Sequence, residues 1–142
     1  MDNIYFFKED CQFDLRKLKK HKKWLNQLAD QYKYEIAEIN YIFCSDEYLH
    51  KINLDYLDHD TYTDIITFDL NDSEEQNNLI ESDIFISIDR IKDNANNLKI
   101  GFKQELSRVM AHGVLHLIGF KDKTEDEKSK MREAENKALE LL

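Results

Sequence analysis

The chain has 142 residues, of which 42% are hydrophobic, and its formal net charge at pH 7 is −9. This length suits one compact domain with a single core and is too short for two ordinary domains. No apolar run approaches the ~18–20 residues of a membrane span, no secretory signal is recognisable, and the acidic balance argues against a general nucleic-acid-binding protein. Cys11 and Cys44 form no motif, so we expect reduced thiols in a cytoplasmic protein.

Strand-like and helix-like segments alternate along the first half of the chain. Residues 4–7 form a short apolar run suited to a strand. Asp14 is an expected N-cap for a basic helix over residues 14–32. Residues 39–44 predict a second strand, and residues 45–54 predict a helix that begins with the capping pair Ser-Asp.

The second half continues the alternation. Residues 63–68 and 83–88 are rich in β-branched and aromatic residues and predict two strands, with a polar, mobile loop over 69–79 between them. Three helices are predicted after these strands, over residues 89–98, 102–118 and 125–141. The expected fold class is therefore α/β (α+β): a single domain, residues 1–142, with a small mixed sheet of about four strands packed with helices.

The helix predicted over residues 14–32 begins with a basic segment, although the chain as a whole is acidic. Residues 16–23 carry six basic side chains in eight positions. Leucines recur at helical spacing through the same stretch, so an amphipathic helix would bury them and display the lysines outward. A solvated helix face is the simpler interpretation, and a phosphate-backbone contact is the functional one. The candidate nucleic-acid-binding residues in this helix are Lys19, Lys20, Lys22 and Lys23.

Two histidines near the C-terminal end are spaced as metal ligands. His112 and His116 are four residues apart, so on a helix both imidazoles share one face. Gly119 can end the helix and turn the chain back, which lets Asp122 supply a third ligand. Zinc held this way keeps a water whose pKa falls toward ~7, so the segment predicts hydrolysis. Gly113 leaves room beside a ligand, whereas the alternative is a histidine pair packed in the core.

Three segments carry a resemblance to a known family. Residues 111–120, with the sequence AHGVLHLIGF, match a helix that ends His-Gly-x-Leu-His-Leu-x-Gly. Residues 54–68 are similar to an Asn-x-x-Tyr-Arg-x-x-Asp-x-Pro-Thr-Asp-Val-Leu-Ser-Phe segment, and residues 82–87 resemble a Gly-Asp-Ile-x-Ile-Ser strand. In their order along the chain, residues 54–68, 82–87 and 111–120 resemble the YbeY family of bacterial rRNA-maturation endoribonucleases.

The resemblance implies a small α/β metalloprotein with one zinc ion, Zn²⁺, per chain. It implies a single-strand-specific endoribonuclease in small-subunit rRNA 3′-end maturation, ribosome biogenesis and ribosome quality control. The implied partners are single-stranded rRNA and the ribosomal small subunit or a ribosome-associated protein, with no membrane. Two family ligands transfer to His112 and His116, but the family's last histidine falls at Asp122. An anionic third ligand is expected to weaken the Lewis acidity of the ion and to favour harder ions such as Mn²⁺.

Two more positions depart from the family pattern: Leu57 replaces an arginine and Tyr62 a proline. An arginine near phosphate clamps it and stabilises developing charge, so either catalysis is weaker here or another cation substitutes. Arg108, one turn before His112, is a candidate catalytic residue, with an ordinary ion pair as the alternative. Lys121, beside the third ligand, is a candidate RNA contact, with a solvated side chain as the alternative.

Two other function classes stay open. A metallopeptidase-like hydrolase is disfavoured because Gly113 stands where His-Glu-x-x-His enzymes carry a glutamate base. A non-catalytic ribosome-assembly protein with a structural metal would use the basic helix for RNA contact. Glu105, two turns before His112, either orients a ligand or forms a salt bridge, and we favour the salt bridge.

Overall fold

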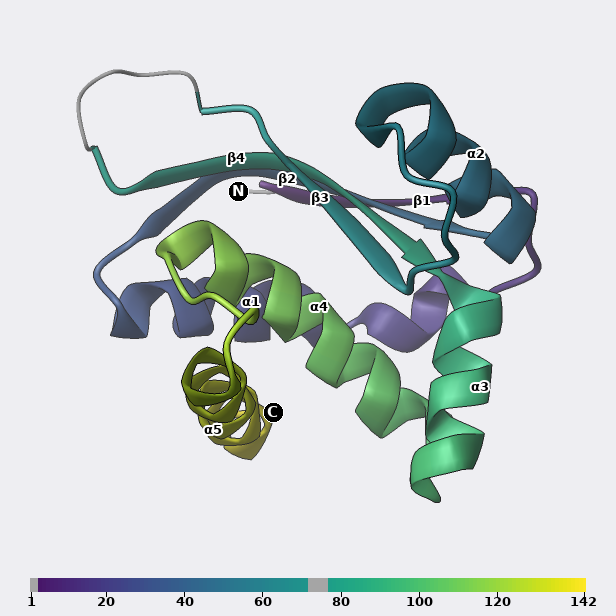
Figure 1. Cartoon of the computed structure of the whole chain (residues 1–142). Helices are drawn as coiled ribbons and strands as arrows, with labels where there is room; N and C mark the ends of the chain where they lie inside the picture. Colours follow the sequence, from purple (N-terminus) through teal and green to yellow (C-terminus); the bar gives the residue numbers. More distant parts are fainter. Residues whose placement is uncertain (1–2, 72–76) are drawn as a thin grey trace.

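One mixed sheet forms the frame of the computed structural model, which describes residues 3–71 and 77–142. Its strands are β1 (Ile4–Glu9), β2 (Glu35–Cys44), β3 (Ile65–Asp69) and β4 (Leu79–Ser87). They lie in the order β1-β2-β4-β3, with β1–β2 and β2–β4 parallel and β3–β4 antiparallel (Figure 1). The prediction of an α/β domain with a small mixed sheet is confirmed.

Helices cover the sheet unequally on its two faces. They are α1 (His21–Gln31), α2 (Asp46–Leu57), α3 (Ile88–Leu98), α4 (Phe102–Ile118) and α5 (Glu125–Glu140). A short 3-10 helix, η1 (Leu15–Leu18), precedes α1. Figure 1 shows α2 on the upper face of the sheet, α1, α4 and α5 below it, and α3 continuing downward from the end of β4. The helix α4 thus lies between the sheet and α5.

Local side-chain hydrogen bonds explain where several helices begin. Ser45 and Ser87 cap α2 and α3 by accepting from backbone N–H groups one turn later. Thr124 and Glu127 form a capping box at the start of α5. The single basic helix predicted over 14–32 was wrong, because Asp14 caps η1 and also binds the guanidinium of Arg16. This local turn ends before α1 begins.

The strand boundaries extend beyond the predicted ones. Strand β4 begins at Leu79 and β2 at Glu35, several residues before the apolar runs that suggested them. Pairing depends on backbone hydrogen bonds, so polar side chains are accommodated where they face solvent. Conversely, β3 begins at Ile65, two residues later than predicted. Residues 72–76, the middle of the predicted mobile loop, lie outside the described residues.

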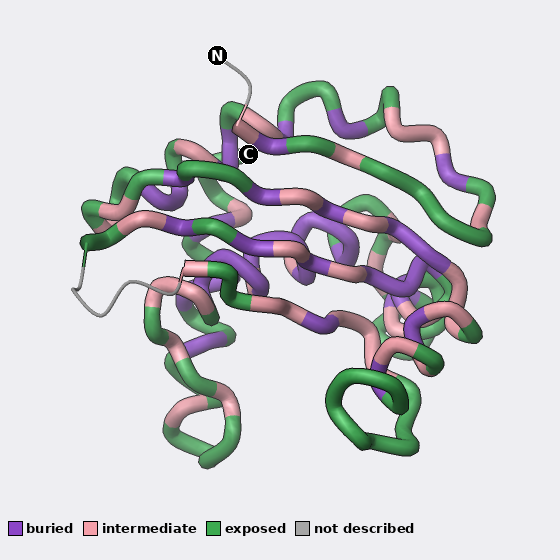
Figure 2. Tube along the Cα trace, turned by 90° about the horizontal axis from the view of Figure 1, so that it is seen from above, coloured by how far each residue is buried: buried purple, intermediate pink, exposed green. Residues whose placement is uncertain are grey.

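The main core lies between the sheet and the lower helices. Tyr41 and Phe43 of β2 pack there with Met110 and Val114 of α4, and the hydroxyl of Tyr41 donates to the carbonyl of Met110. Buried segments concentrate along the middle strands when the sheet is seen from above (Figure 2). Helix α4 is therefore held rigidly, which matters because it carries both candidate histidines.

The upper face has a smaller apolar cluster, in which Cys44 packs with Leu49 of α2 and Ile66 of β3. Cys11 and Cys44 are free thiols. Across residues 3–71 and 77–142, every helix is too short or too polar to cross a lipid bilayer.

Candidate functional site

A cavity of about 380 Å³ opens between β3 and the C-terminal half of α4, and it is called the histidine cavity below. The predicted ligands His112, His116 and Asp122 all line it, together with Arg108. The remaining lining residues are Thr63, Asp64, Ile65, Thr67 and Val109. The structure thus brings the sequence-predicted ligands to one cavity wall.

The end of α4 places Asp122 beside the first histidine. Gly119 has φ +124°, which L side chains rarely adopt, and its N–H bonds to the carbonyls of Leu115 and His116. The chain then returns and brings Oδ2 of Asp122 to 3.3 Å from Nε2 of His112. Two ligands about 2.1 Å from one tetrahedral ion lie roughly 3.4 Å apart, so this pair already has the separation that zinc requires.

His116 takes no part in the contact between His112 and Asp122. Its side chain lines the same cavity but is exposed, whereas His112 is half-buried. Among the residues that the structure describes, no three His, Cys, Asp or Glu side chains converge closely enough to hold an ion. The chemistry of the donor set fits zinc, and an exposed imidazole can rotate to complete the set.

Glu135 of α5 binds the ring nitrogen of His112 that does not contact Asp122. Its Oε2 accepts a hydrogen bond from Nδ1 of His112 over 2.7 Å, and its side chain is only 2% exposed. Burial disfavours the charged imidazole, but the hydrogen bond and negative charge of Glu135 outweigh burial and raise the pKa of His112. With Nδ1 occupied, Nε2 is the atom left to face Asp122 and a ligand.

Arg108 fixes Glu135 within a buried ionic network. Its guanidinium donates to Glu105 and, over 2.9 Å, to Oε1 of Glu135. Burial alone would raise the pKa of Glu135, yet the hydrogen bond from His112 and the charge of Arg108 lower it. The salt bridge favoured for Glu105 is confirmed. The Arg108 side chain is only 14% exposed, so its ion pairs are not the surface contacts considered from the sequence.

Gly113 allows a close approach, but by the sheet and not by a ligand. A Cβ atom at this position would lie 3.1 Å from Cδ1 of Ile84 and 3.2 Å from Cδ1 of Ile65. The expectation that the glycine leaves room beside a metal ligand was therefore wrong. The absent side chain lets α4 pack closely against β3 and β4.

Two residues of the site had no assigned role in the sequence. Asp64 precedes β3, lines the cavity and accepts a hydrogen bond from the amide of Asn94. Burial raises the pKa of Asp64, partly offset by Arg108 and His112. Its signal was present, because Asp64 lies in the second family-like segment. Nothing in the sequence distinguishes Glu135, because it is one of many charged residues in the helix predicted over 125–141.

Unlike Asp122, the two other positions that depart from the family motif do not line the histidine cavity. Leu57 is at the end of α2, is 41% exposed and does not line the histidine cavity. Tyr62 stacks on the ring of His50, with centroids 4.3 Å apart. Lys121 is exposed and is not a lining residue.

The four lysines predicted to contact nucleic acid separate into two groups. Lys19 and Lys20, just before α1, line a second cavity. Lys22 instead places its amine 5.5 Å from the centroid of the Phe6 ring, and Lys23 is exposed. None of the four lines the histidine cavity.

Comparison with known proteins agrees with this geometry. A relative from Cytophaga hutchinsonii, named endoribonuclease YbeY, is 56% identical over 140 residues, which cover 99% of this chain and 96% of that protein. One of the same name from Amoebophilus asiaticus is 49% identical, covering 94% and 89%. The solution structure of TM1509 from Thermotoga maritima superposes with a TM-score of 0.68 at 23% identity, covering 97% and 87%, and shows the same fold. The family model described as endoribonuclease YbeY matches residues 3–142, so the chain belongs to the YbeY family.

Proposed function

We propose that this protein is a single-strand-specific, metal-dependent endoribonuclease that acts on small-subunit rRNA. One zinc ion per chain would be held by His112, His116 and Asp122. The contact of Nε2 of His112 with Oδ2 of Asp122 at 3.3 Å, inside a cavity that His116 also lines, carries the proposal. Membership of the endoribonuclease family supports the substrate class.

The protein side chains have separable roles in this proposal. Glu135 orients His112 through Nδ1, and Arg108 holds Glu135 in turn. Arg108 is thus a positioning residue, because two carboxylates already occupy its guanidinium. When bound, zinc supplies Lewis acidity and positive charge at the scissile phosphate.

Asp64 brings a second carboxylate to the cavity wall. A hydrolysis needs an acceptor for the proton of the attacking water, and a carboxylate oxygen of Asp64 can take it. The partly buried surroundings raise the pKa of Asp64, which makes its carboxylate a better proton acceptor at neutral pH than an exposed one. The protein lacks the family's arginine at Leu57, so charge stabilisation at phosphate depends more heavily on the ion.

The decisive experiment combines metal content with RNA cleavage. Protein purified without added ions is analysed for bound metal and then incubated with single-stranded RNA, with and without chelator. We expect about one zinc per chain, cleavage that chelator abolishes, and loss of both in His116→Ala. His59→Ala is the matched control, because His59 is exposed and lies outside the histidine cavity.

The same samples separate the competing functions. A non-catalytic assembly protein would bind small subunits and metal without cutting RNA, and a peptidase would cut unstructured peptides. Cleavage of RNA that survives both chelation and His116→Ala would disprove the metal-dependent proposal. Association of His112→Ala with small subunits, measured by sedimentation, shows whether binding persists when cleavage is lost.

A further inference from the structure

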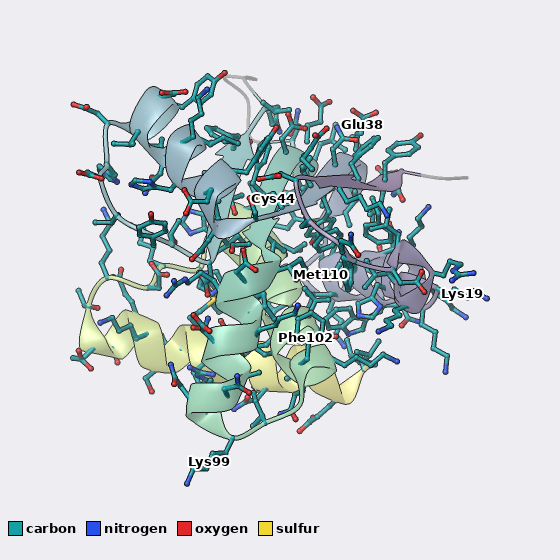
Figure 3. All side chains as sticks on the ribbon, turned by 90° about the vertical axis from the view of Figure 1, so that its right-hand side faces the viewer. Lys19, Glu38, Cys44, Lys99, Phe102 and Met110 are labelled. Carbon is teal, nitrogen blue, oxygen red and sulfur yellow. The ribbon has the colours of Figure 1, made fainter. Side chains whose placement is uncertain are left out.

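A second and larger cavity, of about 780 Å³, lies where η1, the first turns of α4 and the end of the chain meet. We call it the basic cavity. Lys19 and Lys20 border it from the segment after η1, Lys103 and Ser107 from α4, and Leu142 from the end of the chain. Figure 3 shows Lys19 projecting from the surface, with other nitrogen-tipped side chains gathered near it. The proposed cleavage reaction makes no use of this cavity.

The charge of the basic cavity is opposite to that of the whole chain. Five cationic side chains and a single acidic side chain line it, although the formal net charge of the protein is −9. The carboxylate, Asp14, is already bound to the guanidinium of Arg16. In the described part of the chain, no carboxylate pairs with the four lysines of the cavity: Lys17, Lys19, Lys20 and Lys103. Their mutual repulsion would be relieved by an anionic ligand.

The inner wall of the basic cavity has the polar and apolar groups to bind a ligand larger than a small anion. Nε2 of the buried His21 contacts the hydroxyl of Ser107 at 2.9 Å, and its Nδ1 has no hydrogen-bond partner in the described part of the chain. Leu139 and Leu142 add apolar surface beside these polar groups. The volume lies within the ~300–1,000 Å³ typical of organic-ligand sites and far exceeds that of one phosphate. Cations beside an apolar wall match a nucleotide, whose base and phosphate need different surroundings.

Different residues of α4 line the basic cavity and the histidine cavity. Gln104 lines the former and Arg108 the latter. Residues four apart on a helix are neighbours, with Cβ atoms roughly 5–6 Å apart. Gln104 is exposed and Arg108 is partly exposed. An RNA strand that reaches both cavities would pass over this part of α4.

We propose that the basic cavity binds nucleotides of the RNA substrate that lie outside the cleavage position. Their phosphates would contact the lysines, and a base would pack on the leucines. The identity of the polymer rests on the proposed function, whereas the anion site rests on the cavity itself. The cavity would then increase the affinity for long RNA without taking part in bond cleavage.

Binding measured without metal tests the basic cavity separately from catalysis. Fluorescence anisotropy with a single-stranded RNA of about 20 nucleotides is recorded in chelator, with any tag at the N-terminus because Leu142 lines the cavity. The variant is Lys19→Gln/Lys20→Gln/Lys103→Gln. Its control is Lys8→Gln/Lys51→Gln/Lys92→Gln, which makes the same charge change at exposed lysines outside both cavities.

We expect the cavity variant to bind this RNA about 10-fold or more weakly, and its log–log salt slope to decrease by about 2 for three lost phosphate contacts. The control should stay within about twofold of the unmodified protein. Equal losses in both variants would overturn the proposal. So would an acidic peptide that displaces the RNA from the cavity at matched concentration.

Two further readouts locate the effect. Titration with a short oligouridine should shift the backbone NMR signals of Lys103 and Ser107, and unchanged signals would contradict the assignment. In the zinc-loaded enzyme the cavity variant should raise KM for long RNA and leave kcat unchanged. If the protein bound RNA in this way but never cleaved it, the proposed function would be disproved, and the proposal that the basic cavity binds RNA would still hold.

Discussion

The ring N–H of His112 on α4 donates from Nδ1 to Oε2 of Glu135 on α5 across 2.7 Å. This bond joins two helices that follow each other in the chain, and it leaves Nε2 facing Asp122. Carboxylates that hold a ligating imidazole in this way control its tautomer and orientation. The final helix is therefore part of the site, although none of its residues lines the histidine cavity.

Replacing Glu135 by glutamine should weaken metal binding. The neutral amide no longer favours the N–H tautomer at Nδ1, and we expect zinc affinity to fall by about 10- to 100-fold. Competition with a chromophoric chelator measures the affinity, and circular dichroism verifies that the variant is folded. The control is Glu133→Gln, an exposed position on the same helix whose carboxylate lies 3.3 Å from Lys137. An unchanged zinc affinity in Glu135→Gln would show that Glu135 does not position His112 for metal binding.

Changing Asp122 to histidine should restore the family's ligand set. A neutral ligand leaves more positive charge on the ion, so we expect a stronger preference for zinc over Mn²⁺ and a lower pH optimum for RNA cleavage. Metal competition and a pH–rate profile measure the two effects. Asp126→Asn makes the same charge change at an exposed residue of α5 and should alter neither. An unaltered metal profile and optimum in Asp122→His would disprove the expectation.

Gly119→Ala should destabilise the protein through the backbone alone. No atom lies within 4 Å of the added methyl group, but φ is +124°, and such strain amounts to about 1–3 kcal/mol. Urea unfolding measures the loss. Gly101 also has no neighbour within 4 Å, and its φ of −70° suits alanine, so Gly101→Ala should change stability by less than about 1 kcal/mol. Equal losses at the two glycines would contradict this explanation.

Stability should decrease in mild acid because of His21. Burial, assisted by the charge of Lys103, lowers the pKa of His21 to about 4 in the folded protein. The unfolded chain binds this proton near pH 6.5, so the contribution is intact above that value and is lost as the pH falls toward 4. Between pH 7.5 and 5.5 we expect a loss of about 1 kcal/mol from this group.

The variant His21→Gln isolates that contribution. Urea unfolding at both pH values should show a smaller decrease in the variant than in the unmodified protein. Asp64 and His112 titrate in both proteins, with raised pKa values, so their effects cancel in the comparison. The same pH dependence in both proteins would show that His21 titrates normally.

Local patterns predicted much of the fold. The helix over 102–118 agrees with α4 at both ends, because its apolar residues recur with helical period and Gly119 stops it. All four strands lie in segments that were predicted to be strands, but β2 and β4 are longer than their apolar runs. Strand length depends on the neighbour that supplies backbone partners, and a single segment does not reveal that neighbour.

The sequence by itself determined the helix that presents His112 and His116, the turn that returns Asp122, and the family to which these motifs point. The helix and the turn depend on residues a few positions apart, whose spacing sets their direction, and the family depends on three such local motifs. Only the tertiary structure decided that Glu135 holds His112, that Arg108 is occupied by two carboxylates, and that Gly113 faces the sheet. These contacts join elements distant along the chain, so they depend on how helices pack and not on local periodicity.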